Sequence, residues 1–271
     1  YVFEARPWEL KKTESIDVMD AVGSNIRVDT FGWEVKRVLP RINEDINEEW
    51  ISDKTRYSCD GLKNQRLDTP YLREGDKFNK ISWNEAYKVL KLKLENTNSD
   101  KVGCFTGDLT NMETTFAVKE LFHKVLKSSL IDSRSENYYV NFSERQNYRF
   151  NSNILGIEES DLILMIGCNP RYEATILNSR IRKSYLKSKL PIYSTNDIGN
   201  QTYPYKIINN SSNLVKDIID ENNDLAEKII NAKKPIIIIG QSVLKLKSGK
   251  FIFEELKNFL IKNNKINTEW N

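Results

Sequence analysis

Two short, uninterrupted runs of apolar residues, Leu162–Gly167 and Pro235–Gly240, constrain the fold of this chain more than any other feature. Each run has the length of a strand and is far too short to span a bilayer. A strand that is apolar at every position must be covered on both of its faces. Because segments with helical spacing alternate with these runs, the pattern predicts an α/β fold in which helices cover a parallel sheet.

Helical and strand patterns alternate from Ser82 onwards, and two capping boxes mark helix starts. Ser82 with Glu85 predicts the first helix, and the run Thr110-Asn111-Met112-Glu113 predicts a second that continues to about Leu126. Hydrophobic periodicity predicts the remaining elements. We expect helices over Glu173–Lys187, Leu214–Ile230 and Phe251–Ile261, with an interruption near Asn222 left open, and strands over Val102–Phe105 and Pro191–Ser194.

Residues 1–75 have a different pattern, which predicts a small β-rich unit. Asn25–Thr30 and Glu34–Leu39 alternate apolar and polar residues on either side of Phe31-Gly32, as in a hairpin. We therefore expect a β-rich domain over residues 1–75 and an α/β domain over residues 76–271.

Charge and cysteine usage exclude several classes of protein. The 41 basic and 38 acidic residues nearly balance, whereas a dedicated nucleic-acid-binding protein has a strong basic excess. Cys59, Cys104 and Cys168 are far apart, so neither a disulfide framework nor a zinc site is indicated. The single histidine, His123, lies in an amphipathic helical pattern without a partner for catalysis. We therefore predict no catalytic residue and no metal ligand in this chain.

Six longer segments carry a family resemblance: Ala5–Asp17, Asp20–Val28, Leu39–Tyr57, Asp60–Leu67, Gly167–Ala174 and Asn178–Ser184. They resemble the middle of the largest iron–sulfur subunit, the 75 kDa type, of respiratory complex I, NADH:ubiquinone oxidoreductase. Segments of this length are much more specific than a short motif. Matching residues are frequent up to about Arg73 and again around 154–186. After about 190, only the order of the expected helices and strands supports the resemblance.

The resemblance also implies what the two expected domains are. Residues 1–75 would be a degenerate 4Fe-4S domain of the β-rich type that accompanies Mo/W bis-MGD cofactors. Residues 76–271 would be an α/β domain like that of molybdopterin oxidoreductases, incomplete at its C-terminus.

Four positions, Asp17, Asp20, Ser24 and Ser52, stand where a cluster-binding member of the family would have cysteines. With cysteine there, the spacing would be C-x2-C-x3-C and a distant fourth, which suits an iron–sulfur cluster held by thiolates. Carboxylate and hydroxyl oxygens are poor substitutes. The resemblance thus implies a lost cluster, and we expect no cofactor in this chain. A hard cation held by Asp17 and Asp20 is the alternative.

A second candidate site is the loop Gly167, Cys168, Asn169, Pro170 and Arg171 at the carboxyl end of the first apolar run. Open α/β sheets bind ligands at such ends, and in molybdopterin oxidoreductases the equivalent loop helps to hold a guanine dinucleotide cofactor. We favour the alternative of a strand-to-helix turn whose Gly and Asn tolerate unusual backbone angles. On that interpretation the cofactor loop is vestigial, and Cys168 is a small buried apolar residue.

The interface candidates are Arg6, Trp8, Arg180, Arg182 and Lys183. Arg and Trp are typical interface anchors, and Arg6 and Trp8 follow the point where the family's upstream cluster portion ends. Arg180, Arg182 and Lys183 form a basic group that could dock an acidic neighbour or an anion. The alternatives are a local core contact for the first pair and a solvated helical face for the basic group.

The resemblance implies a structural, redox-silent part of the complex I large subunit in the peripheral arm. This part would hold cluster-bearing neighbours while electrons pass from NADH to ubiquinone. The 2Fe-2S and 4Fe-4S clusters would lie in the upstream portion or in a partner chain, and the flavoprotein subunits would be further partners. The implied location is the matrix side of the mitochondrial inner membrane, with membrane association only through the complex and no nucleic acid.

Two other classes of function are the alternatives. One is a molybdopterin-dependent oxidoreductase that still binds its nucleotide cofactor at Gly167–Arg171, and the other is a free-standing nucleotide-binding module. The replaced cysteine positions and the lack of converging catalytic groups in the sequence weigh against both.

Overall fold

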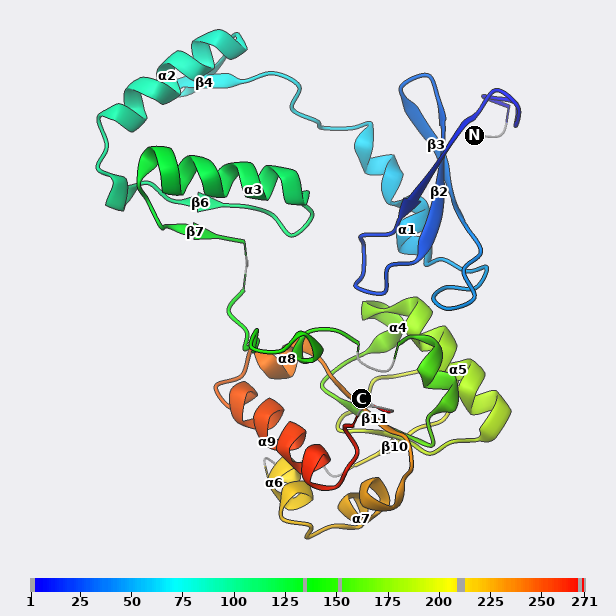
Figure 1. Ribbon diagram of the computed structural model, residues 1–271. Helices are drawn as coiled ribbons and strands as arrows, with labels where there is room; N and C mark the ends of the chain where they lie inside the picture. Colours follow the sequence, from blue (N-terminus) through cyan, green and yellow to red (C-terminus); the bar gives the residue numbers. More distant parts are fainter. Residues whose placement is uncertain (1–2, 134–135, 151–152, 209–212, 268–269, 271) are drawn as a thin grey trace. The chain divides into compact units, whose positions relative to one another are not determined.

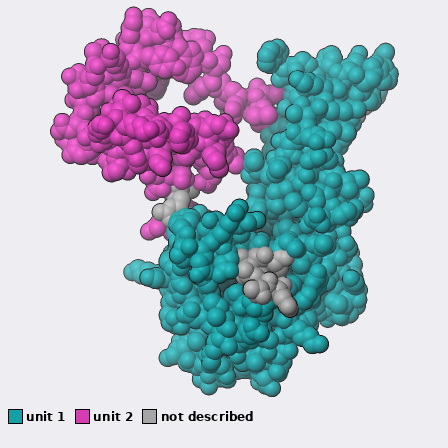
Figure 2. Space-filling view, in the orientation of Figure 1, with its two compact units in different colours: residues 1–59, 138–271 teal, residues 60–137 magenta. Residues whose placement is uncertain are grey.

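The computed structural model describes residues 3–133, 136–150, 153–208, 213–267 and 270. The chain forms two compact units, which Figure 2 colours separately: unit 1 consists of residues 1–59 and 138–271, and unit 2 of residues 60–137. Unit 1 is thus built from two separate stretches of sequence. The expected division at residue 75 into a β-rich and an α/β domain stays a prediction.

The first part of unit 1 is an antiparallel sheet, as the alternating pattern predicts. Its strands follow one another in the order β1 (Lys11–Ile16), β2 (Asn25–Phe31) and β3 (Glu34–Pro40). The turn between β2 and β3 contains Gly32 at φ +57°, a left-handed angle that glycine adopts without strain. Ile26, Val38 and Ile51 form a small core, and the short helix α1 (Asp53–Tyr57) follows.

The second part of unit 1 contains a parallel sheet, which confirms the predicted fold class. Its described strands lie in the order β10 (Lys206–Ile207), β9 (Ile192–Ser194), β8 (Leu162–Ile166) and β11 (Pro235–Ile239). The two apolar runs of the sequence, β8 and β11, are therefore neighbours. The helices of this part are α4 (Pro170–Glu173), α5 (Thr175–Ser188), α6 (Leu214–Ile219), α7 (Asp224–Asn231), α8 (Gln241–Leu244) and α9 (Gly249–Lys262).

Strand β8 is buried on both faces, and its alternate residues pack into two separate cores. Ile163 and Met165 share one core with side chains of α5. Leu162, Leu164 and Ile166 share the other with side chains of α6, α7 and α9. Figure 1 shows α5 on one side of β11 and the group of α6, α7 and α9 on the other. Burial on both faces explains why the run is apolar at every position.

The described residues of unit 2 form two short pairs of strands and two helices. Strands β4 (Tyr71–Glu74) and β5 (Lys77–Lys80) pair antiparallel, and β6 (Cys104–Phe105) and β7 (Ile131–Asp132) pair parallel. The helices are α2 (Trp83–Glu95) and α3 (Met112–Glu120), and α3 continues as π-helix η3 (Leu121–Leu126). The chain also contains the short 3-10 helices η1 (Ser58–Leu62), η2 (Ser99–Lys101), η4 (Arg145–Asn147) and η5 (Leu155–Glu159).

The two predicted capping boxes have different outcomes. The first is confirmed, because the Glu85 amide donates to Ser82 Oγ at 3.3 Å and the Ser82 amide donates to the Glu85 carboxylate at 2.8 Å. The second is wrong, because Asn111 rather than Thr110 caps α3 and its side-chain oxygen accepts from the Thr114 amide. Asparagine is the better N-cap residue of the two.

Two other predicted elements are shorter than expected. The segment Leu214–Ile230 is interrupted, since α6 ends at Ile219 and α7 begins at Asp224 after its N-cap, Asn223. The strand predicted over Val102–Phe105 is reduced to Cys104–Phe105. The interruption that the sequence left open near Asn222 is thus confirmed, whereas the bounds of the strand are corrected.

Candidate functional site

Three of the four positions where a cluster-binding member of the family would have cysteines lie in the loop between β1 and β2. They are Asp17, Asp20 and Ser24. The Asp17 amide donates to the Ser24 carbonyl oxygen at 2.8 Å, which closes the loop. Gly23 permits this closure because its φ of +76° lies in the left-handed region. The fourth position, Ser52, is the N-cap of α1.

Asp17 and Ser52 are connected through Thr55. The Thr55 hydroxyl donates to Asp17 Oδ2, and Ser52 Oγ lies 2.9 Å from Thr55 Oγ1. Ser52 Oγ also accepts from the Thr55 amide at 3.2 Å. All three side chains are buried, with exposed fractions of 4%, 5% and 3% for Asp17, Ser52 and Thr55. The sequence pattern did not single out Thr55, because its bond to Asp17 spans 38 residues and leaves no local signal.

Asp20 and Ser24 do not join this hydrogen-bonded group within the described part of the chain. Asp20 Oδ1 accepts from the Val22 amide at 2.9 Å, and burial raises the pKa of the Asp20 carboxyl group. Ser24 is fully buried, and its Oγ has no hydrogen-bond partner among the described residues. Hydrogen bonds therefore connect the side chains at two of the four positions, Asp17 and Ser52, through Thr55. The side chains of Asp20 and Ser24 take no part in this group.

These side chains do not fit an iron–sulfur cluster. Iron in such clusters is held by cysteine thiolates, and Cys59 is the single cysteine in residues 1–103. The Cys59 thiol lies 3.7 Å from the Arg56 carbonyl oxygen. Oxygens of Asp17, Ser52 and Thr55 already bind one another. No group of three or more His, Cys, Asp or Glu side chains that could hold a metal ion occurs among the described residues.

The loop after β8 lies where the order of the strands reverses. The chain continues from β8 to β9 and β10 on one side and places β11 on the other, and open sheets bind ligands at such a switch point. Here the two strand-end loops pack directly on each other. A Cβ atom on Gly240 would lie 2.0 Å from the Gly167 carbonyl oxygen, and the Ser242 hydroxyl donates to that oxygen.

Two backbone amides of this loop are also already bonded. The Gly167 amide donates to Thr195 Oγ1 at 3.2 Å, and the Asn169 amide donates to the Glu173 carboxylate at 2.8 Å. A dinucleotide cofactor needs such amides to bind its phosphates. The loop therefore does not fit a guanine dinucleotide, and its geometry favours the strand-to-helix turn.

The side chains of the remaining loop residues, Pro170, Arg171 and Cys168, are accounted for by the local structure. Pro170 is the first residue of α4, where its missing amide hydrogen costs nothing. Arg171 is exposed and donates to the Asn200 carbonyl oxygen. Cys168 is buried, and burial raises the pKa of its thiol to about 12. A thiol protonated at neutral pH is a poor nucleophile, so Cys168 has the buried apolar character expected from the sequence.

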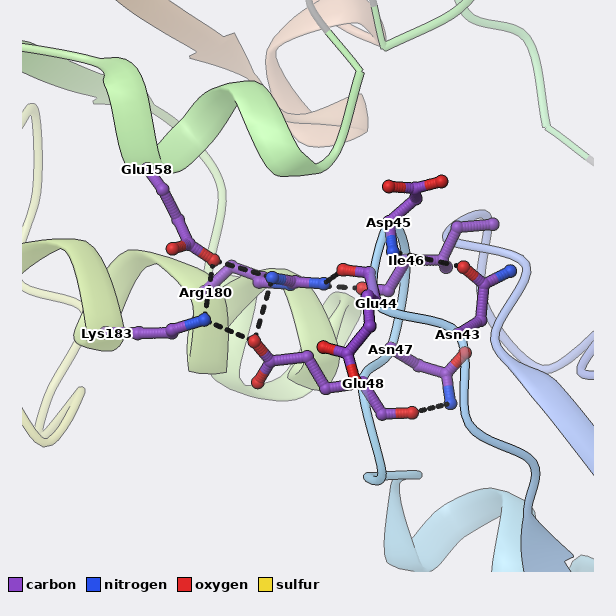
Figure 3. Close-up of polar contacts among 9 residues, drawn as sticks. All are labelled: Asn43, Glu44, Asp45, Ile46, Asn47, Glu48, Glu158, Arg180 and Lys183. Carbon is purple, nitrogen blue, oxygen red and sulfur yellow. Dashed lines mark hydrogen bonds and ion pairs between the residues drawn. The ribbon is translucent and has the colours of Figure 1, made fainter.

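Arg180, one of the predicted interface residues, is buried inside unit 1. Its Nε donates to the Ile46 carbonyl oxygen at 3.1 Å, and its Nη2 donates to the Glu44 carbonyl oxygen. Its Nη1 lies 3.0 Å from Glu48 Oε1 and 2.6 Å from Glu158 Oε1. Figure 3 shows the guanidinium between Glu158 and the loop that carries Glu48. Arg180 is therefore not free to dock a neighbour, because it joins the β-rich part of unit 1 to α5.

Lys183 completes this group, and we call Glu48, Glu158, Arg180 and Lys183 the Arg180 cluster. The Lys183 ammonium binds both carboxylates, and the hydrogen bonds to Glu48 and Glu158 raise the pKa of Lys183. Burial acts to raise the pKa of Glu158, but the hydrogen bonds from Lys183 and Arg180 outweigh burial and lower it. Two cations thus compensate two partly buried carboxylates.

The other interface candidates are exposed. Arg182 lines a groove of about 410 Å³ together with Trp50 and Leu186. Trp8 is 74% exposed, and the Arg6 guanidinium carbon lies 5.5 Å from the centre of its ring. A local core contact for Trp8 is therefore excluded, and a role in docking stays a prediction.

His123 is exposed in η3 of unit 2. Every described helix of the chain is too short or too polar to cross a membrane.

Comparison with curated proteins finds relatives that match along the whole chain. The NADH-ubiquinone oxidoreductase 78 kDa subunit of Candida albicans is 44% identical over 275 residues, which cover 100% of this chain and 38% of the relative. The 75 kDa subunit of Reclinomonas americana is 42% identical and covered to 41%, again over 100% of this chain. A subunit of the NADH-quinone oxidoreductase of Rickettsia bellii is 40% identical over 100% of this chain and covered to 40%. The chain spans about two fifths of the length of these relatives.

Two family models match consecutive parts of the sequence. The model described as NADH-ubiquinone oxidoreductase NDSU1/NuoG-like, 4Fe-4S domain matches residues 10–60. The molybdopterin oxidoreductase model matches residues 66–271, which is most of the chain. With its parallel α/β sheet and this match, the chain belongs to the molybdopterin oxidoreductase family.

Proposed function

We propose that this chain is the central part of a complex I large iron–sulfur subunit, with a structural role and no redox group of its own. One observation carries the proposal: Asp17 and Ser52 have oxygen side chains at positions where a cluster-binding member of the family would have cysteines, and hydrogen bonds to Thr55 connect the two. The names of the relatives, all subunits of NADH-ubiquinone or NADH-quinone oxidoreductase, support the assignment to the complex.

The structural role would consist of holding cluster-bearing neighbours at fixed separations while electrons pass from NADH to ubiquinone. Electron transfer between clusters requires such fixed separations, and a close-packed protein interior is stiff. Unit 1 has two apolar cores on the faces of its parallel sheet. The Arg180 cluster adds a polar connection between its β-rich and α/β parts.

The partners would be other subunits of the peripheral arm, on the matrix side of the mitochondrial inner membrane. They would include the cluster-bearing N-terminal portion of the same subunit and the flavoprotein subunits, which would hold the 2Fe-2S and 4Fe-4S clusters and the flavin. Mitochondrial relatives in Candida albicans and Neurospora crassa support this location. Exposed Arg6 and Trp8 are the side chains we expect at such a contact.

Native separation of membranes from the source cell tests the proposal. The chain would be followed by mass spectrometry beside NADH-oxidising activity. We expect it to migrate in one large complex with flavin- and cluster-bearing subunits. Migration as a small species away from that activity would contradict the proposal.

The same separated sample distinguishes the alternative of a molybdopterin-dependent oxidoreductase. Molybdenum or pterin released on denaturation would favour that alternative. The contact between the Gly167 and Gly240 loops supports the opposite expectation, that neither is released.

A further inference from the structure

We propose that the hydrogen bonds from Ser52 through Thr55 to Asp17 replace a cluster as the link between the β1–β2 loop and α1. The inference rests on the proposed absence of a cluster from this loop. A cluster with ligands at positions 17 and 52 would tie together two segments that are distant in sequence. The bond between Asp17 and Thr55 spans 38 residues and joins these same two segments.

The direction of each hydrogen bond follows from the number of available protons. Thr55 donates its single hydroxyl proton to Asp17. Ser52 must therefore donate its own proton to Thr55 Oγ1, at 2.9 Å, while a lone pair of Ser52 accepts the Thr55 amide at 3.2 Å. All hydroxyl donors thus point towards the carboxylate, and bonds in such a buried series polarise and strengthen one another.

Asp17 connects this series to the backbone of its own loop. Its second carboxylate oxygen, Oδ1, accepts from the Met19 amide at 2.9 Å. The Lys54 ammonium, from α1, donates to the Met19 carbonyl oxygen at 3.1 Å. The loop and α1 are therefore joined by two separate contacts, one buried and one exposed. Loss of the buried contact would leave Asp17 Oδ2 without its hydroxyl donor in a buried site.

Ser24 provides a comparison within the same loop. It also stands at a cysteine position and is fully buried, but its hydroxyl has no partner among the described residues. A buried hydroxyl without a partner does not stabilise the fold. Removal of the Ser24 hydroxyl should therefore have no cost, whereas removal of the Thr55 hydroxyl should loosen the loop.

Amide hydrogen exchange of the full chain, followed by mass spectrometry, tests the inference with the variants Thr55→Val and Ser24→Ala. We expect Thr55→Val to speed exchange about tenfold or more in residues 17–24 and 52–57, without a change in β8 and β11. Ser24→Ala should match the unchanged chain. Equal exchange in the two variants would overturn the inference.

A third variant, Ser52→Ala, keeps the test informative if Thr55→Val fails to fold. It removes the hydroxyl bond between Ser52 and Thr55 and the N-cap bond from the Thr55 amide, and it leaves the bond between Thr55 and Asp17. Because loss of the cap by itself loosens residues 52–57, the response of residues 17–24 is the informative one. We expect a smaller rise in exchange in the same two segments, and no rise would contradict the inference.

Iron and acid-labile sulfide, assayed in the unchanged chain, separate this inference from the proposed function. A cluster in residues 10–60 would refute the proposed function. Unaltered exchange in a chain free of iron would refute only the hydrogen-bonded link.

Discussion

Units 1 and 2 contain helices of similar length but have very different cores. In unit 1, β8 is buried at every position and α5 buries six residues. In unit 2, α2 and α3 bury none, and Phe122 is the single buried large apolar side chain in the described part of that unit. Many others there are exposed: Tyr71, Phe78, Trp83, Tyr87, Leu90, Leu92, Phe105, Leu109, Met112, Phe116, Leu121, Val125 and Leu130.

The difference between the two units shows that the local interactions that form a helix are distinct from the packing that stabilises a unit. Helix α2 has a complete capping box, and its apolar residues recur at helical spacing. These local signals are sufficient to define the helix, but most of the stability of a helix comes from packing its apolar face. We therefore expect unit 1 to carry most of the stability of the chain and unit 2 to be the weaker unit.

Hydrogen exchange of the whole chain should give the largest contrast. Amides in the strands of a buried core exchange only through openings that cost nearly the full stability, whereas poorly packed segments open at little cost. We expect β8 and β11 to exchange about a thousandfold more slowly than α2 and α3. Similar protection in the two units would break the comparison.

Substitution of Arg180 should produce the largest effect of a single residue on unit 1. Arg180→Ala removes one of the two cations that bind Glu158, whose side chain is 13% exposed. It also leaves the carbonyl oxygens of Glu44 and Ile46 without the donors that Arg180 supplies. Breaking a buried pair from one side costs about 3–5 kcal/mol, and because Lys183 still binds Glu158 we expect a loss near the lower end of that range. Urea unfolding would measure this loss.

Arg182→Ala is the matched control, because Arg182 is exposed on the same helix. Its effect on the free energy of unfolding should stay within about 0.5 kcal/mol. Equal losses for the two arginines would mean that the Arg180 cluster does not join the two sequence stretches of unit 1.

A pair of leucines compares the two units directly. Leu164→Ala removes a fully buried side chain from β8 and should cost about 2–5 kcal/mol. Leu90→Ala in α2 removes a side chain that is 53% exposed and should change the stability by less than about 0.5 kcal/mol. Thermal unfolding of both variants would measure the difference, and a large loss for Leu90→Ala would reveal a core in unit 2.

Acid should weaken unit 1 through Glu158, with a smaller effect. The folded state lowers the pKa of Glu158 below its ordinary value of 4.5. The stabilisation is therefore complete above about pH 4.5 and is lost as the pH falls through the folded pKa. Glu158→Gln should remove this part of the pH dependence, which unfolding midpoints from about pH 6 to about pH 3 would measure. If Glu158→Gln had the same pH dependence of unfolding as the unchanged chain, Glu158 would not be a source of the loss of stability in acid.

The sequence predicts those features that depend on neighbouring residues. The continuous apolar residues of β8 and β11, the turn at Gly32 and the capping box at Ser82 all leave a local pattern. The four positions where the family would have cysteines could also be located, because the segments that surround them resemble that family.

The sequence does not reveal the partners of polar side chains that meet only in the folded chain. Arg180 has the same pattern as an exposed helical arginine, but its partner carbonyl at Ile46 lies 134 residues away. Thr55 is 38 residues from Asp17, so its role depends on how the loop and α1 are placed. Contacts of this kind follow from tertiary packing and have no periodicity of their own.

The central claim is that residues 10–60 retain the fold of a cluster domain without the cluster. Iron and acid-labile sulfide, measured per chain after anaerobic purification, test it most directly. Because oxygens of Asp17, Ser52 and Thr55 are bonded to one another, we predict neither element above background. Iron and sulfide in the amounts of a [4Fe–4S] cluster would contradict the claim.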